Sequence, residues 1–154
     1  MTTPSAALDD SAFLRAILNL VIPPEGPMPG AGDLDLDLWP AVARSLSQNA
    51  AAFATLTAGL EAVRTAALVR DPGGLAALPQ AAALEVVNAL TAQHPTLLPT
   101  LARATAMAYY QQPDVLIALG EPARPPFPEG FELEPISDEW LAILHQRAQP
   151  RPTT

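Results

Sequence analysis

The apolar residues of this chain recur at intervals of three and four, which is the spacing of an amphipathic α-helix. The longest run extends from Asn49 to Arg70, where one stripe contains Phe53, Leu56, Leu60, Val63 and Ala67. The sequence Asp71-Pro72-Gly73-Gly74 follows it and consists of residues that favour turns. This segment is therefore predicted to be the longest helix.

Other segments have the same spacing. Asp9 or Asp10 is expected to cap a first helix that continues to Ile22 and ends before Pro23-Pro24. Its apolar side contains Phe13, Ile17, Leu18 and Val21. A further helix is predicted from Asp37, with Pro40 in its first turn. Another is predicted from Gln80 to Gln93, with Leu84, Val87 and Leu90 inward. The next begins at about Pro95–Pro99 with Thr96 as cap, and the residues along one of its sides are Leu98, Leu101, Thr105, Ala108 and Tyr109.

The end of the chain contains a short helix, an extended segment and a last helix. Pro113 is expected to begin a helical turn that Gly120 terminates in a left-handed conformation. Residues 121–136 contain five prolines and are expected to be extended, and Ser137 then caps a last helix to about Gln146. Together the pattern predicts an all-α, single-domain bundle of five or six helices over residues 9–147, with disordered ends at 1–8 and 148–154.

The composition favours a helical fold and limits the classes of partner that the protein can bind. Hydrophobic residues make up 49% of the 154 residues but aromatic residues only 5%, and alanine is abundant, which suits closely packed helices better than a sheet. The net charge is −8, from 16 acidic residues against 8 basic ones, all of them arginine. Nucleic acid and anionic membrane surfaces are therefore disfavoured as partners.

Cysteine is absent, so disulfides, thiolate metal sites and a cysteine nucleophile are excluded. The acidic segment Met1–Asp10 does not resemble a signal peptide, and no two arginines are adjacent as a twin-arginine signal requires. Polar residues or proline interrupt every apolar run before 18 residues. We expect a cytoplasmic protein with no direct membrane insertion, and export together with a partner stays open.

Three aspartates at alternate positions, Asp33, Asp35 and Asp37, resemble the start of a calcium loop. Such a loop needs glycine at its sixth position and glutamate at its twelfth, where this chain has Leu38 and Arg44. An extended segment with one apolar side is the simpler interpretation. The two histidines, His94 and His145, lie far apart in sequence, whereas zinc needs three or four ligands, so no metal site is predicted.

No catalytic or cofactor-binding residue is predicted either. Glu61 and Glu85 are the acids most embedded in apolar helical sequence, but Arg64 or Arg15 can pair with Glu61 at the surface. No serine lies in a nucleophile elbow. The sequence Gly30-Ala31-Gly32 lacks the third glycine and the preceding strand of a dinucleotide-binding motif.

The aromatic residues are the best candidates for partner contact. Tyr109 and Tyr110 point about 100° apart on a helix, so one is expected in the core and the other at the rim. Phe127, Phe131 and Trp140 either pack on this domain, which the notable proline content favours, or anchor a partner. The hypothetical partner-binding residues are Met28, Tyr110, Phe127, Phe131 and Trp140.

The order of several short motifs resembles the gluconate 2-dehydrogenase subunit 3 family. They are Leu18-x-Leu-Val-Ile-Pro-Pro, Met28-Pro29-Gly30-Ala31-Gly32-Asp33-Leu34, Tyr109-Tyr110-x-x-Pro113, Leu119-Gly120 and Pro125-Pro126-x-Pro128-x-Gly130, which together span about residues 10–135. The resemblance implies a small accessory subunit without a cofactor. It would support the assembly, stability or export of a large flavoprotein dehydrogenase of the glucose–methanol–choline type, acting on a sugar or polyol.

Exported members of that family often carry a twin-arginine signal, which this sequence lacks. Two other classes of function therefore stay open beside the accessory subunit. One is a homo-oligomeric helical protein, for example a homodimer, which needs no other partner. The other is a small-molecule binder or enzyme, which would need an apolar pocket with converging polar groups.

Overall fold

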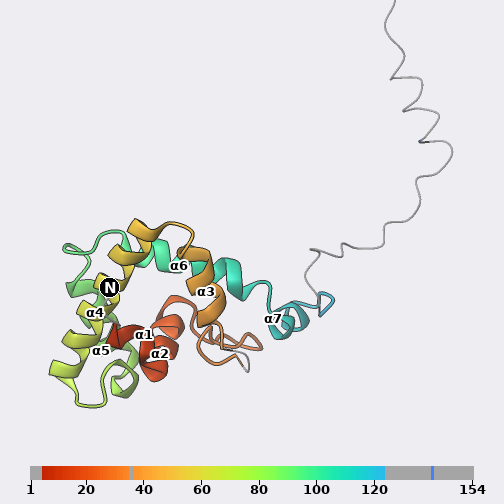
Figure 1. Cartoon of the computed structure of the whole chain (residues 1–154). Helices are drawn as coiled ribbons and strands as arrows, with labels where there is room; N and C mark the ends of the chain where they lie inside the picture. The colour runs from red at the N-terminus through yellow and green to blue at the C-terminus, as the bar shows by residue number, and fades with distance from the viewer. Residues whose placement is uncertain (1–4, 35–36, 124–139, 141–154) are drawn as a thin grey trace, which may run out of the picture.

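The computed structural model describes residues 5–34, 37–123 and Trp140, and over these residues it is all-α (Figure 1). The α-helices are α1 (Ala6–Asp9), α2 (Ser11–Val21), α3 (Trp39–Leu46), α4 (Ala50–Arg70), α5 (Gln80–Ala89), α6 (Leu97–Tyr109) and α7 (Pro113–Ala118), with a 3₁₀ turn η1 (Leu75–Ala77) before α5. The described residues contain no β-strand, and their only β-bridge joins Glu25 to Met28. The predicted all-α, single-domain class is confirmed.

Two helices begin where the sequence places an N-cap. The side chain of Asp10 accepts a hydrogen bond from the Phe13 amide at the start of α2, at 3.0 Å. Asn49 does the same for the Ala52 amide at the start of α4, at 3.1 Å. Each cap satisfies an amide that has no partner inside its helix, which explains why these boundaries could be predicted.

Helix α4 is the centre of the bundle and packs against α1, α3, α5 and α6. Its inward residues follow the predicted stripe, since Leu56, Leu60, Val63 and Ala67 are all at most 2% exposed. The stripe also contains Gly59, where an added Cβ would lie 3.1 Å from Cδ1 of Leu97. The absence of a side chain at Gly59 therefore lets α6 approach α4 closely.

By length and composition alone, α4 is also long and apolar enough to cross a membrane, because 18 consecutive residues within it have a mean hydropathy of 1.3. Core helices of bundles meet the same criterion. The burial of Leu60 and Val63, both fully inaccessible to solvent, gives α4 a packing role inside this domain.

Helix α5 departs from its predicted orientation. Leu84 was expected to point inward, but it is 39% exposed, and that expectation is wrong. The residues that α5 buries are Ala83, Val86 and Val87, while Leu90 packs at the edge of the core. Because apolar residues occur on several sides of α5, among them Ala81, Ala82 and Ala83 in succession, hydrophobicity alone did not define which side of α5 faces α4.

The N-terminal segment also differs from its prediction. Residues 1–8 were expected to be disordered, whereas the structure forms α1 from Ala6, with Ala7 fully buried. The stabilising group is distant in sequence, because the carboxylate of Glu61 on α4 accepts a hydrogen bond from the Ala7 amide at 2.8 Å. A local sequence pattern carries no information about such a cap.

Thr105 on α6 is fully buried, as its place on the predicted inward side implied. Its hydroxyl oxygen is the one buried side-chain oxygen or nitrogen of the described residues without a hydrogen-bond partner. Thr105→Val keeps the branched shape and removes that hydroxyl. We expect it to raise the free energy of unfolding by about 1 kcal/mol in urea denaturation. Thr57→Val is the control, because the Thr57 hydroxyl already donates to the Phe53 carbonyl and gains nothing by removal.

Candidate interaction surface

The proline-rich loop Pro23–Gly32 is fixed to α2 at its carboxyl end. The Ala31 amide donates to the Ile22 carbonyl at 2.9 Å, and the Gly32 amide donates to the Asn19 side-chain oxygen at 2.7 Å. The Asn19 amide group in turn donates to Asp33 at 2.8 Å. Asn19 thus binds two consecutive residues, the backbone of Gly32 and the side chain of Asp33, and fixes the end of the loop on α2.

The tip of the loop is a tight turn. Glu25 and Met28 exchange two backbone hydrogen bonds, at 3.0 and 2.9 Å, and Gly26 between them has a φ of +56°, which glycine adopts without strain. Pro23, Pro24 and Pro27 are exposed around this turn. An exposed tip with three prolines and closed hydrogen bonds loses little conformational entropy on binding.

Tyr109 connects the loop to α6. Its hydroxyl donates to the Pro29 carbonyl at 2.6 Å, and its ring is 1% exposed. Burial, followed by the neighbouring Tyr110, raises the pKa of Tyr109, so the phenol stays a hydrogen-bond donor. Tyr110 is 53% exposed, and the two rings meet edge to face with centroids 5.2 Å apart. The predicted division into one core and one rim tyrosine is confirmed.

Large exposed hydrophobic residues gather in one part of the sequence. Of the exposed large hydrophobics in the described residues, four lie at the end of α6 and in or just after α7: Met107, Tyr110, Ile117 and Leu119, each 51–59% exposed. Helix α7 projects beyond the end of α6, on the far side from α4 and α5 (Figure 1). Val115 is its fully buried residue. We call these four residues the α6–α7 apolar group.

The hypothetical contact residues have different environments. Tyr110 is exposed and belongs to the α6–α7 apolar group, and Trp140 is 63% exposed. Met28 is partly buried and packs against the domain's own core. Phe127 and Phe131 lie outside the described residues, as do the predicted extended segment beyond residue 123 and the residues of the predicted last helix other than Trp140.

Sequence reasoning missed Ile117 and Leu119 as exposed groups. The available signal was the composition of Pro113–Ala118 and its flank, where Val115, Leu116, Ile117 and Leu119 lie within five residues. The side chains of a helix point in all directions around its axis, so a helix that is apolar on every side can pack only some of them against one neighbour. Some of these side chains therefore had to face away from the core.

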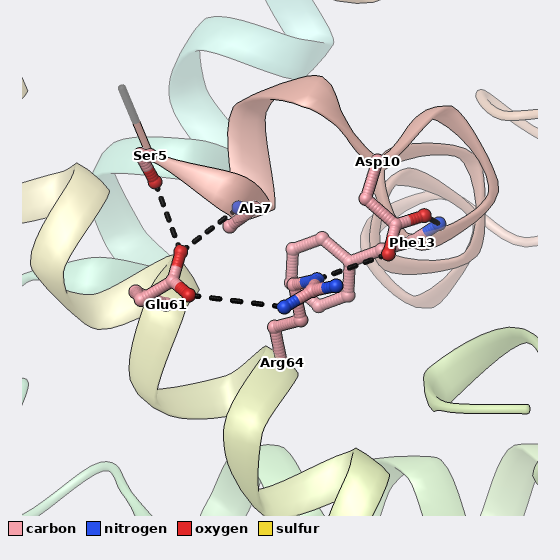
Figure 2. Close-up of polar contacts among 6 residues, drawn as sticks. All are labelled: Ser5, Ala7, Asp10, Phe13, Glu61 and Arg64. Atoms are coloured by element: carbon pink, nitrogen blue, oxygen red, sulfur yellow. Dashed lines mark hydrogen bonds and ion pairs between the residues drawn. The ribbon is translucent and has the colours of Figure 1, made fainter. Parts of the chain in front are cut away.

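The two acids considered for acid–base chemistry have structural partners instead. Figure 2 shows the Glu61 carboxylate accepting hydrogen bonds from the Ser5 hydroxyl at 3.0 Å and the Ala7 amide at 2.8 Å. Arg64 lies 3.8 Å from the other Glu61 oxygen, and its Nε donates to Asp10 at 3.0 Å. This network joins the starts of α1 and α2 to α4. The second acid, Glu85 on α5, pairs with Arg70 at the end of α4 at 2.7 Å, and both side chains are exposed.

Arg64 is therefore the expected partner of Glu61, while Arg15 forms no ion pair with any described residue. The described residues hold no group of three or more His, Asp or Glu side chains that could bind a metal ion. Asp33 is engaged by Asn19, and Asp37 accepts from the Trp39 amide at 3.1 Å. Both carboxylates thus contribute to chain geometry.

The network makes a prediction about pH. The hydrogen bond from the Phe13 amide, with a smaller contribution from Arg64, lowers the pKa of Asp10 despite its partial burial. Ionised Asp10 therefore stabilises the fold above its unfolded pKa of about 3.9, and this stabilisation disappears as the pH falls through the lower, folded-state pKa. At neutral pH, Asp10→Ala should cost about 1–2 kcal/mol through loss of the cap.

Asp10→Asn is the matched control for charge, because asparagine keeps the cap acceptor and cannot ionise. Its stability difference from the parent should shrink as the pH is lowered from 5 to 2, measured by urea denaturation at each pH. A difference that stays constant over this range would show that the ionised carboxylate adds nothing to stability.

No family model, no curated protein and no solved structure matches this chain.

Proposed function

We propose that this chain is a non-catalytic accessory subunit that binds a larger flavin-dependent oxidoreductase of the glucose–methanol–choline type. The proposal combines the motif resemblance with one structural observation: Tyr109, whose hydroxyl binds the loop Pro23–Gly32 at the Pro29 carbonyl, packs edge to face against the exposed ring of Tyr110. Aromatic residues on pre-organised surfaces are the usual energetic centres of protein interfaces.

The α6–α7 apolar group adds to this proposal. Met107, Ile117 and Leu119 are more than half exposed near Tyr110 in the sequence, and burying such side chains on a partner is favourable. The carboxylates of Asp10 and Glu61 are engaged in caps and an ion pair that join α1 and α2 to α4, which gives these two groups a role in the scaffold.

The test is co-expression with a candidate flavoprotein of that type, followed by co-purification and measurement of the flavin absorbance. We expect the flavoprotein to be soluble in higher yield when this chain is present. Phe127→Ala, Phe131→Ala and Tyr110→Ala should each weaken the association by about 1–3 kcal/mol, with little change in melting temperature.

Val69→Ala is the matched control, since Val69 is 86% exposed at the far end of α4 and should leave the association unchanged. Loss of fold stability with retained binding would mean that the phenylalanines belong to this domain's own core. A concentration-dependent dimer in light scattering, with no gain from the flavoprotein, would favour the homo-oligomeric alternative. The net charge of −8 on each copy opposes that association.

A further inference from the structure

A cleft of about 410 Å³ lies between the end of α3 and the outer side of α6. Ser45 and Leu46 line it from α3, while Thr100, Arg103 and Met107 line it from α6. Its volume falls within the range of small-molecule sites in proteins, about 300–1,000 Å³. It is separate from the loop Pro23–Gly32, none of whose residues lines it.

Arg103 is the charged residue among those that line the cleft, and its guanidinium has no partner among the described residues. Ion pairs within the described part of the chain use Arg64 and Arg70, and no hydrogen bond from the Arg103 side chain to a described residue exists. Arg64, which lines a different pocket, shows the contrast, because Asp10 already occupies it there. The five donors of Arg103 are available to a ligand.

The distribution of acids around this cleft is uneven. The chain has 16 acidic residues, yet residues 38–60 and 86–113 contain none. These two segments supply all of α3 and α6 and therefore both walls of the cleft. An anion that would be repelled elsewhere by a protein of charge −8 meets no carboxylate on either wall here.

The remaining lining residues specify the rest of the ligand. Ser45 and Thr100 provide two hydroxyl groups that can donate to an oxygen, and Leu46, Ala104 and Met107 provide apolar surface. A guanidinium binds a planar carboxylate with two parallel hydrogen bonds. The apolar wall suits a short hydrocarbon chain, which inorganic phosphate lacks.

We propose that the α3–α6 cleft is a binding site for a small monocarboxylate with a short aliphatic chain, whose carboxylate pairs with Arg103. This site goes beyond the accessory-subunit function and does not depend on it, so its test needs no partner protein.

The experiment is a titration of the ¹⁵N-labelled full chain with sodium hexanoate at constant ionic strength, followed by NMR. We expect saturable shifts of the amide resonances of Ser45, Thr100 and Arg103. Arg103→Gln should weaken hexanoate binding about tenfold or more, because it removes the charged donor. Arg15→Gln makes the same change of charge on α2, away from the cleft, and should leave the affinity unchanged.

Four outcomes would overturn the proposal. They are shifts without saturation below about 10 mM hexanoate, equal affinity of the Arg103→Gln variant, equal binding of 1-hexanol, and equal binding of inorganic phosphate at the same residues. The third would reduce the cleft to an apolar surface, and the fourth would reduce it to an unselective anion contact. Circular dichroism of both variants checks that the helices are intact.

Discussion

Gly32→Ala is expected to lower the free energy of unfolding by about 3 kcal/mol or more, a large part of the stability of a domain of this size. A Cβ at position 32 would overlap the carbonyl oxygen of Arg15 and lie 2.8 Å from its carbonyl carbon. These atoms belong to the backbone of α2 and cannot rotate away as a side chain could.

Relief of this overlap requires the loop to move off α2. The Gly32 amide would then lose its 2.7 Å hydrogen bond to Asn19, and the neighbouring Ala31 amide its 2.9 Å bond to Ile22. Ala31, which is 1% exposed, would also lose its packing. The effect of the substitution therefore combines steric overlap with unpaired buried amides.

Gly26→Ala provides the comparison, measured by urea denaturation under the same conditions. Gly26 has a φ of +56°, but an added Cβ would have no atom within 4 Å. Its substitution should therefore show only the backbone strain of a left-handed residue, about 1–2 kcal/mol. If Gly32→Ala destabilises no more than Gly26→Ala, the loop is not seated on α2 as described.

The need for glycine at position 32 could not be predicted from the sequence. The stretch Pro23–Gly32 clearly indicated a loop, because proline and glycine disfavour helix there. What sets Gly32 apart is its crossing of the α2 backbone at Arg15, a contact between segments distant in sequence. Spacing along the chain contains no record of where a loop folds back.

The same distinction, between local patterns and contacts of distant segments, separates the helix starts that were predicted from the one that was missed. The starts of α2 and α4 depend on Asp10 and Asn49, which act within three residues of themselves. A cap at Asp9 or Asp10 was predicted, and Asn49 was predicted as the start of the longest helix. The helix α1 depends on Glu61, more than fifty residues away, and was missed. Local chemistry was sufficient for the fold class, and non-local contacts determined which segments joined the core.

The candidate surface follows this rule too. The tyrosine pair was predicted correctly as one buried and one exposed ring, because adjacent helical residues diverge in direction. The bond from Tyr109 to Pro29 crosses eighty residues and was not predicted. Likewise, no pattern singled out the cleft beside Arg103, which exists only because α3 and α6 pack together.

Tyr109→Ala is expected to lower the free energy of unfolding by about 3–5 kcal/mol, the usual effect of removing a large buried aromatic ring. Tyr109 is the largest fully buried side chain of the described residues. Its loss would leave a cavity between α6 and the loop and would leave the Pro29 carbonyl without its 2.6 Å donor.

Tyr109→Phe separates these two contributions. The ring stays in place and only the hydroxyl is removed, so we expect a loss of about 1–2 kcal/mol. Tyr110→Ala is the control within the same pair, because a side chain that is 53% exposed should change stability by less than about 1 kcal/mol. All three variants are compared by chemical denaturation, with two-state behaviour checked by two optical probes.

The order of these three effects is the decisive result. If Tyr110→Ala destabilises as much as Tyr109→Ala, the exposed ring is part of the core, and Tyr110 loses its place in the proposed contact surface. If Tyr109→Phe changes nothing, the Tyr109–Pro29 hydrogen bond does not hold the loop. The expected order instead leaves Tyr110 available to a partner, while Tyr109 packs against the Tyr110 ring and binds the loop at Pro29.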